Sequence, residues 1–305
     1  MKFSLSKYIW FDGKFVPVNM AKVPVTTHAI HYGTSIFEGI RAYWDSKSLY
    51  VFRLKDHIKR FRNSGKFYNI RLNFSDKQIE NAVIDLCKKN KIKKSCYIRP
   101  FYFVGQYGIN FHVTQKAPTH TAIFAFPFGD LFNKSGITAT ISKWRKFSDM
   151  STPTQAKMGG NYLNSILATQ DAKQRGFDEA ILLDQSGNVS EAPGENIFLV
   201  KNDELITPPL SSSALDGITR RTIITLAKDM NLKIKVQKVS KKELKLADEI
   251  FLSGTAAEIT PIIKIDKKKI GNEEVGNITK LFMATYSDIV MNKNENYSHW
   301  LTTVY

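Results

Sequence analysis

The sequence predicts a protein of mixed α and β structure, α+β or α/β, in two domains. Short β-branched and aromatic segments with two helical segments fill residues 1–127, and strand and helix patterns alternate over 138–305. A connection rich in proline and glycine lies between them at 128–137. We therefore expect a small N-terminal α/β domain, an interdomain loop and a large C-terminal domain.

The composition is typical of a globular protein. Of the 305 residues, 43% are hydrophobic and 12% aromatic, and no apolar stretch approaches the roughly 20 residues needed to cross a bilayer. The N-terminus carries Lys2, Lys7 and Asp12 with no apolar core between them, unlike a secretory signal, so we expect a cytoplasmic location. Cys87 and Cys96 lack CxxC spacing and are predicted to be buried thiols. The histidines show no metal-ligand spacing, so no metal site is expected.

The formal net charge of +16 suits either nucleic acid or acidic metabolites as partners. The basic residues are spread along the chain and are not interleaved with aromatic residues in an RNA-binding signature. A lysine-rich surface without a nucleic-acid or membrane partner is therefore the favoured interpretation.

Hairpins, helices and strands follow one another in the first half. Asp12-Gly13 supplies the two positive-φ positions of a tight turn, and Ser75 with Gln78 forms a capping box. The stretch 28–41 is expected to be a packed connection. The predicted elements are a hairpin over 8–18, a hairpin with strands 41–44 and 49–53, helices over 55–67 and 76–90, and strands over 95–104 and 119–126.

Helices and strands alternate in the second half. The predicted elements are a helix from Gly160 to Gly176, a hairpin over 178–191, a strand over 196–200, a helix after Arg220, a capped helix over 241–246, a strand over 249–253 and a helix over 277–290. The first of these helices should bury Leu163, Ile166 and Leu167, and the last Ile278, Leu281 and Phe282. Trp300 and Leu301 suggest that the tail docks.

One lysine differs from the others in its surroundings. Lys157 precedes a glycine pair in a small, mostly uncharged stretch, whereas many lysines occur in runs such as 88–91 and 267–269. Desolvation lowers the pKa of a lysine, and the neutral amine can attack a carbonyl to form a Schiff base. The alternative is an ordinary solvated loop lysine.

Tyr97 and Arg99 lie two residues apart in a predicted strand and project from the same face of the sheet. An arginine in an apolar strand is costly unless it meets an anion. The pattern leaves open whether this anion is a ligand or the carboxylate of a structural ion pair.

Two stretches offer backbone N–H groups to an anion. Small and hydroxylated residues over 211–217 precede a helix, and Thr255-Ala256-Ala257 follow the end of a strand at Gly254. For the second stretch a plain β-turn is the alternative.

Five segments resemble one known family. They are Tyr32–Arg41, Lys157–Tyr162, Ser190–Phe198, Ser213–Arg220 and Ser253–Pro261. In this order they resemble the branched-chain amino acid aminotransferases, which use pyridoxal phosphate (PLP) on the fold shared with D-amino acid aminotransferases and aminodeoxychorismate lyases. The resemblance runs from about Tyr8 to the C-terminus. It implies the fold-type-IV architecture, with a β-barrel-like core in the larger C-terminal domain.

The resemblance also implies the cofactor contacts. Lys157 would carry PLP as a Schiff base and act as general base, and Glu191, preferred over Glu195, would bind the pyridine nitrogen. The other implied cofactor residues are Arg60, Ile218, Thr219 and Thr255 for the phosphate, Leu215 beside the ring and Tyr162 for the phenolic oxygen.

The implied reaction is reversible amino transfer between leucine, isoleucine or valine and 2-oxoglutarate. The implied substrate residues are Tyr32, Phe37 and Gly39 in the pocket wall, Tyr97 and Arg99 for the side-chain carboxylate of glutamate, and Thr255, Ala256 and Ala257 for the α-carboxylate. A homo-oligomer is expected, in which a neighbouring chain completes each site. D-amino acid aminotransferase and aminodeoxychorismate lyase are the alternatives. Phe128 and Leu131 depart from the family, which often has tryptophan and tyrosine there.

Overall fold

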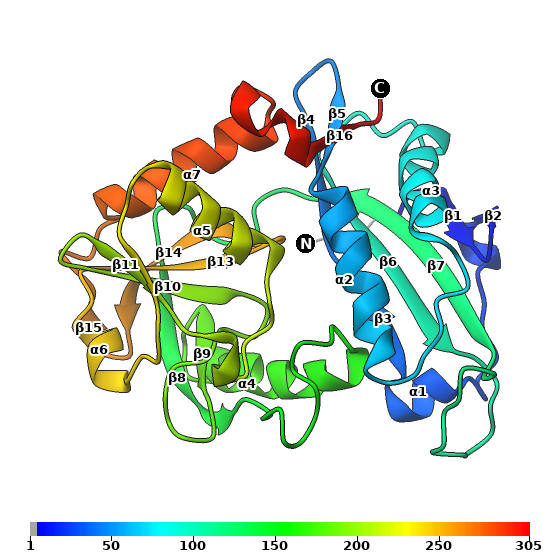
Figure 1. Cartoon of the computed structure of the whole chain (residues 1–305), viewed down its shortest axis with the longest axis horizontal. Coiled ribbons are helices and arrows are strands. Elements are labelled where there is room, and N and C mark those ends of the chain that lie inside the picture. Colours follow the sequence, from blue (N-terminus) through cyan, green and yellow to red (C-terminus); the bar gives the residue numbers. More distant parts are fainter. Residues whose placement is uncertain (1–4) are drawn as a thin grey trace. The chain divides into compact units, whose positions relative to one another are not determined.

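The structure is a computed structural model that describes residues 5–305. It divides into two compact units, coloured along the chain in Figure 1. The first unit takes the chain up to Gly129 with Ala156–Gly160 and Asp288–Tyr305, and the second takes Asp130–Gln155 and Asn161–Ser287. The predicted mixed α and β fold class is confirmed. The predicted domain limits stay a prediction, and Lys2, at the start of the predicted domain 1–127, lies outside the described residues.

The first unit is built on an antiparallel sheet of eight strands in the order β16-β5-β4-β6-β7-β1-β2, with β3 paired to β6. Its strands are β1 Tyr8–Phe11, β2 Lys14–Pro17, β3 Ser35–Phe37, β4 Ile40–Trp44, β5 Leu49–Phe52, β6 Cys96–Val104, β7 Thr119–Pro127 and β16 Leu301–Thr303. Its helices are α1 His28–Tyr32, α2 Leu54–Lys66 and α3 Asp76–Lys89, with 3-10 turns at Val18–Met20 and Glu295–Trp300.

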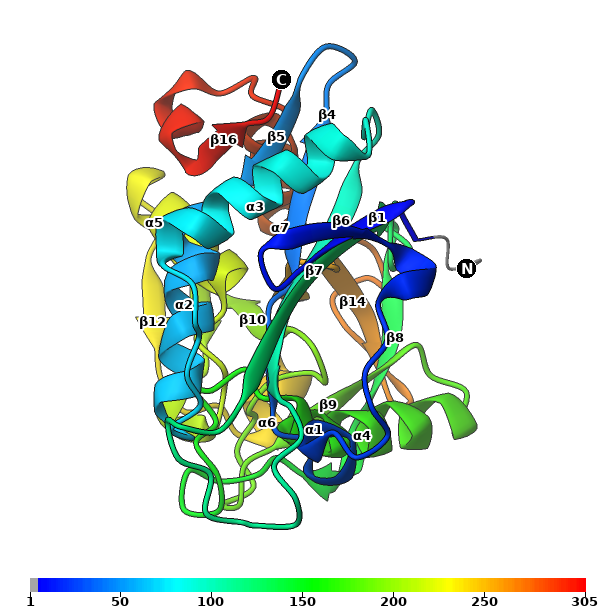
Figure 2. The ribbon, with the colours of Figure 1, turned by 90° about the vertical axis from the view of Figure 1, so that its right-hand side faces the viewer.

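Helices α2 and α3 pack against each other and against this sheet (Figure 2). Ile58 and Phe61 of α2, Val83 and Leu86 of α3, and Ile98 of β6 belong to one buried cluster. The apolar side chains recur every three or four residues along each helix, which puts them on the face toward the sheet.

Local signals in the first half are confirmed. Asp12 and Gly13 have φ values of 45° and 89° in the first hairpin, and Ser75 and Gln78 form the predicted capping box of α3. Cys87 and Cys96 are buried free thiols. The packed connection predicted over 28–41 contains α1 and β3.

The C-terminal tail docks on the first unit, as predicted. Strand β16 pairs with β5, and the Arg53 guanidinium stacks over the Trp300 ring, 4.8 Å from its centroid. Beyond β16, Val304 is buried and the Tyr305 hydroxyl donates to the backbone carbonyl of Cys87 at 3.0 Å.

The second unit contains a mixed eight-stranded sheet in the order β12-β11-β10-β13-β14-β8-β9, with β15 on β14, that curls as an open half-barrel (Figure 1). Its strands are β8 Ile137–Arg145, β9 Glu179–Leu183, β10 Asn196–Lys201, β11 Glu204–Thr207, β12 Ile234–Val236, β13 Glu249–Gly254, β14 Glu258–Ile265 and β15 Lys268–Lys269. Its helices are α4 Tyr162–Gln174, α5 Ile218–Asp229 and α6 Lys241–Lys245, and the helix α7 Asn277–Val290 begins in it. Aliphatic residues such as Ile181, Ile197 and Leu252 fill the core of this sheet.

Helix α4 contradicts one prediction. Leu163, Ile166 and Leu167 were expected inside but are exposed, Leu163 at 64%. The helix instead packs through Ala168 and Ala172 against Ala180 and Leu182 of β9. Small residues let the helix approach the sheet closely, which leaves no space there for leucine.

Helix α7 contradicts a second prediction at one position. Phe282 is buried as expected and Ile278 is half-buried, but Leu281 is exposed. Tyr286 and Ile289, one and two turns after Phe282, complete the buried face in its place. Across residues 5–305, the structure has no helix that is long and apolar enough to span a membrane. The cytoplasmic location stays a prediction.

Candidate active site

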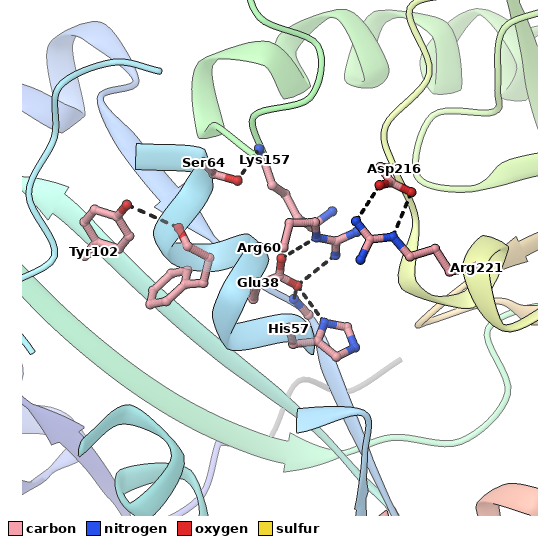
Figure 3. A network of polar contacts seen from close by, with 10 residues as sticks. Glu38, His57, Arg60, Ser64, Tyr102, Lys157, Asp216 and Arg221 are labelled. Atoms are coloured by element: carbon pink, nitrogen blue, oxygen red, sulfur yellow. Dashed lines mark hydrogen bonds and ion pairs between the residues drawn. The ribbon is translucent and has the colours of Figure 1, made fainter. Parts of the chain in front are cut away.

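The segment that carries Lys157 is held inside the first unit by backbone contacts. The Lys157 backbone N–H donates to Ser64 Oγ at 3.0 Å (Figure 3). The Phe37 N–H donates to the Lys157 carbonyl at 3.1 Å. Met158 forms an isolated antiparallel bridge with Ile36. These bonds fix the lysine between α2 and β3.

The glycine pair after the lysine permits this close approach. A Cβ atom on Gly159 would lie 2.3 Å from Ser35 Oγ, and the Gly160 N–H donates to the Gly33 carbonyl at 3.1 Å. A larger residue at 159 would push the segment away from β3. The glycine pair seen after Lys157 in the sequence therefore has a steric cause.

The Lys157 ammonium lies in a partly buried, positively charged setting. Its nitrogen is 4.9 Å from the centroid of the Phe37 ring, and the side chain is half-buried. Burial, and next the charge of Arg60, lower the pKa of Lys157 to about 8, although Glu38 opposes the shift. An appreciable fraction of this amine is therefore neutral near neutral pH, which is not so for a solvated surface lysine.

Glu38, Arg60 and His57 form a buried ion-pair cluster beside this lysine (Figure 3). Arg60 Nε and Nη2 donate to the two Glu38 oxygens at 2.6 and 2.9 Å, and His57 Nδ1 is 2.8 Å from Glu38 Oε2. Burial would raise the pKa of Glu38, but Arg60 and His57 outweigh it and hold that pKa well below its usual range. Burial lowers the pKa of His57, so a neutral imidazole donates from Nδ1 to the carboxylate.

Sequence reasoning missed Glu38 and His57. It named Arg60 only through the resemblance, and the structure shows that Arg60 is buried. The available signal was the spacing of His57, Arg60 and Ser64, which puts a second, polar stripe on the covered part of α2.

Tyr97 and Arg99 project from one face of β6, as predicted. Arg99 Nη2 donates to the Tyr97 hydroxyl at 3.3 Å, and the guanidinium lies 4.7 Å from the Phe37 ring centroid. Among the described residues no carboxylate pairs with Arg99, and its buried Nε has no hydrogen-bond partner there. Of the two alternatives left by the sequence, the structural ion pair is not formed, and the orphaned donor fits an anionic ligand.

Two further predicted substrate residues, Gly39 and Tyr32, also lie in the first unit. A Cβ on Gly39 would lie 1.7 Å from the Tyr97 hydroxyl, so only glycine lets Tyr97 keep its position. Tyr32 ends α1 and packs edge-on against Phe111, with ring centroids 5.1 Å apart.

In the second unit Glu191 is a buried carboxylate with several donors. Its Oε1 lies 2.6 Å from the Lys146 ammonium, and its Oε2 accepts from Asn196 Nδ2 at 3.0 Å and from the Leu215 N–H at 2.9 Å. Glu195, the competing candidate, accepts from the neighbouring Gly194 N–H at 3.1 Å.

Lys146 is a third residue that sequence reasoning overlooked. Burial alone would lower its pKa, but Glu191 first and then Tyr162 reverse the shift, so the net pKa of Lys146 is raised. This lysine therefore stays charged and belongs to the same cluster as two predicted cofactor residues. Its sequence neighbours are exposed and gave no signal.

The two predicted anion-binding stretches lie next to Asn196 and its strand. A Cβ on Gly217, the N-cap of α5, would meet Asn196 Oδ1 at 2.0 Å, which brings Ile218 and Thr219 close to the Glu191 cluster. Asn196 pairs with Ser253 at the end of β13, next to the turn Thr255–Ala257. The N-cap residue Gly217 offers no side chain to cap α5, so the first N–H groups of this helix suit an anion.

The first unit holds a lysine of lowered basicity beside a fixed arginine, and the second unit holds a buried carboxylate with three donors. Each is a feature that PLP-dependent aminotransferases use. The family described as amino-transferase class IV matches residues 35–265, and the chain belongs to this family.

The most informative relatives are branched-chain enzymes. The chain is 42% identical to the branched-chain-amino-acid aminotransferases of Escherichia coli K12 and Salmonella typhimurium, with 97% of each chain covered. The branched-chain aminotransferase of Thermoproteus uzoniensis with norvaline has a TM-score of 0.96 and 41% identity, over 98% of this chain and 100% of that one.

A second structure was solved with its cofactor. The branched-chain amino acid aminotransferase of Thermobaculum terrenum in its PLP form has a TM-score of 0.93 and 33% identity, over 99% of this chain and 99% of that one. The resemblance found in the sequence is confirmed, and the family implies pyridoxal phosphate as the cofactor. Among residues 5–305, no group of three or more acidic, histidine or cysteine side chains could hold a metal ion.

Proposed function

We propose that this chain is a branched-chain-amino-acid transaminase, which moves an amino group reversibly between L-leucine, L-isoleucine or L-valine and 2-oxoglutarate with PLP. The observation that carries the proposal is Lys157, whose pKa is lowered to about 8 between Phe37 and Arg60 on the family's own motif. The names of the relatives supply the substrate class.

Lys157 does the central chemistry in this proposal. Bound PLP supplies an electron sink for the substrate carbanion. Lys157 holds the cofactor through its neutral amine and, once a substrate amine has displaced it, moves the proton at the substrate α-carbon. A pKa near the working pH suits an amine that must both lose and accept a proton.

The remaining residues bind and orient. Arg60, fixed by Glu38, and the N–H groups of Ile218 and Thr219 at the start of α5 suit a phosphate; Thr255 is assigned there by the resemblance. Glu191 is suited to a ring N–H, and Tyr162 is assigned the phenolic oxygen. Leu215 donates its N–H to Glu191 and so links the ring residues to the loop before α5.

The substrate residues suit two kinds of side chain. Phe37, Tyr32 and Gly39 offer an apolar and open wall to leucine, isoleucine or valine. Arg99, with an unpartnered buried donor among the described residues, suits the side-chain carboxylate of glutamate. Ala256 and Ala257, with Thr255, are assigned the α-carboxylate by the resemblance. Phe128 and Leu131 are the two departures from the family. The Phe128 ring centroid lies 5.3 Å from that of Tyr97 and so belongs to this wall, whereas Leu131 is exposed.

The half-reaction tests the proposal. The protein purified with PLP should lose the absorption band of its lysine-bound cofactor on addition of L-leucine and keep it with D-alanine. Lys157→Ala should fold and show neither band nor turnover, and Lys59→Ala, a change at a surface lysine of α2, should behave as wild type. Conversion by D-alanine alone would favour a D-amino acid aminotransferase, and PLP binding without conversion by either amine would favour a lyase.

We further propose that the chain works as a homo-oligomer. Four apolar side chains of the first unit are strongly exposed around α1 and the loop before β7: Val25 at 81%, Ile30 at 60%, Ile109 at 84% and Phe111 at 80%. Phe111 packs against Tyr32, a proposed substrate residue. A second copy that covers this surface would therefore lie next to the proposed pocket wall. Light scattering should give at least a dimer, and Phe111→Asp should shift it toward monomer and lower turnover; a monomeric active wild type would refute the proposal.

A further inference from the structure

Lys146 forms a buried ion pair that the assigned activity does not use. It follows β8 directly, its backbone N–H donates to the Leu183 carbonyl at 2.9 Å, and its ammonium lies 2.6 Å from Glu191 Oε1. The two side chains are 14% and 6% exposed. By contrast Lys143, on β8 itself, is 66% exposed and reaches Asp171 only at 3.7 Å.

Stability is a poor explanation for such a pair. Taking both charges out of water costs several kcal/mol per ion, and replacement of a buried pair by apolar groups is often neutral or stabilising. The position of the pair is informative, because Glu191 is the carboxylate proposed to receive the ring N–H of the cofactor.

The donors around Glu191 leave room for a further one. Lys146, Asn196 and the Leu215 N–H supply one bond each, which makes three, and an ionised carboxylate has about four acceptor positions. Lys146 is the donor on Oε1, whereas Asn196 and the Leu215 N–H both bind Oε2. Removing the lysine would leave Oε1 without the donor that orients it, and the carboxylate would be held at one oxygen only.

We propose that Lys146 is a positioning residue for the cofactor ring, holding Glu191 as an oriented anion whose remaining acceptor position receives the pyridine N–H. This inference rests on the proposed function. Tyr162, the proposed partner of the phenolic oxygen, also acts electrostatically on the Lys146 ammonium. The Lys146 ammonium therefore influences both Glu191 and Tyr162, which are two of the proposed contacts of the cofactor ring.

The test compares cofactor affinity and spectrum in matched variants. Apoprotein is titrated with PLP, and the dissociation constant and the absorption maximum of bound cofactor are recorded. Lys146→Met, which keeps the length and removes the charge, should weaken PLP binding at least about tenfold, or ~1.4 kcal/mol, and shift the band. Lys146→Arg should restore both to near wild type, and Lys143→Met should change neither.

A double-mutant cycle tests whether Lys146 affects PLP binding through Glu191. If Lys146 acts through Glu191, Lys146→Met should cost little further affinity in a Glu191→Gln background. Equal losses in both backgrounds, or wild-type affinity and spectrum in Lys146→Met, would overturn the inference, even if the melting temperature falls. If Lys146→Met does not fold, Lys146→Gln replaces it with the same expectations.

The outcome separates this inference from the proposed function. Wild-type protein that binds no PLP refutes the proposed function itself. Wild-type protein that binds PLP and reacts with L-leucine, beside a Lys146→Met variant that matches it, refutes only the role of Lys146.

Discussion

At the scale of single residues, the chemistry of Lys157 depends on how its charged neighbours are paired. Glu38 is the nearest counter-charge to oppose the pKa shift, but Arg60 and His57 already bind that carboxylate. Lys157 therefore gains little from it, and burial and Arg60 prevail. One buried carboxylate thus fixes an arginine, and the lysine beside that arginine has a lowered pKa.

The first prediction concerns the pH dependence of Lys157. In cofactor-free protein, the rate at which pyridoxal forms an adduct with Lys157 should rise with pH and level off near pH 8, because only the neutral amine attacks and its pKa is lowered to about 8. Below that pH the neutral fraction falls about tenfold per unit. Absorbance followed from about pH 6 to 11, with Lys157→Ala as the blank, measures this rate. A rise that continues to about pH 10.4, as for a free lysine, would contradict the prediction.

The second prediction concerns Glu38. Glu38→Gln should lower the free energy of unfolding by about 3 kcal/mol, because Arg60 is left buried without its counter-charge. The folded-state pKa of Glu38 is depressed, so its stabilisation is complete above the ordinary value of 4.5 and is lost as the pH falls. The difference between variant and wild type should therefore shrink in acid.

Urea unfolding of the apoprotein near neutral pH and below pH ~4.5 measures both effects. The matched control is Glu273→Gln, which removes a solvent-screened ion pair with Lys269 and should cost much less than Glu38→Gln. Equal costs for the two variants would mean that the buried cluster contributes no special stabilisation.

At the scale of elements, single helices and strands carry structural and functional residues side by side. Helix α2 buries Ile58 and Phe61 in the core, and the stripe His57, Arg60 and Ser64 faces the site. The helical period separates the two stripes by about one residue, or 100°. A hydrophobic pattern in the sequence reveals only the apolar stripe. This explains why the sequence indicated the helix but not the polar stripe of His57, Arg60 and Ser64.

The third prediction concerns Gly39, directly before β4, and the Tyr97 side chain of β6, which covers it. Gly39→Ala should displace Tyr97, because the new Cβ would lie 1.7 Å from its hydroxyl, and with it Arg99. The KM for glutamate should rise about tenfold, or ~1.4 kcal/mol, and more than the KM for leucine. Steady-state kinetics with both donors measure this, and Gly129→Ala, where no atom lies within 4 Å of the new Cβ, is the control. An equal rise for both donors would argue against Tyr97 and Arg99 as the glutamate contacts.

At the scale of the whole molecule, the chain returns twice to the first unit. Residues Ala156–Gly160 bring Lys157 to it, and Asp288–Tyr305 bring β16 to the edge of its sheet. Trp300 and Leu301 indicated the docking of the tail, whereas nothing in the sequence indicated that residues 156–160 belong to the first unit. The stability of the first unit therefore depends on the last residues of the chain.

The fourth prediction tests this dependence. Deletion of residues 301–305 should lower the free energy of unfolding by at least about 2 kcal/mol, because it removes the β16–β5 ladder and the burial of Val304. Tyr305→Phe, which removes only the hydrogen bond to the Cys87 carbonyl, should cost about 1 kcal/mol. Thermal and urea unfolding measure both, and an unaffected deletion variant would show that the tail adds no stability.

The sequence by itself determined the family, most of the helices, part of the strands, and signals that act over a few residues. The Asp12-Gly13 turn and the capping box at Ser75 are of this kind, because backbone conformation and cap bonds depend on near neighbours. Lys157 was also recognisable, because a lysine before a glycine pair is a local motif. The assignments of site residues remain predictions.

Only the tertiary structure decided which face of each helix is covered and which charges meet. The close approach of α4 to β9 exposed Leu163, and chain segments distant in sequence brought Glu38 to Arg60 and Lys146 to Glu191. The physical reason is that burial and ion pairing depend on distance in space, whereas periodicity and spacing record only distance along the chain.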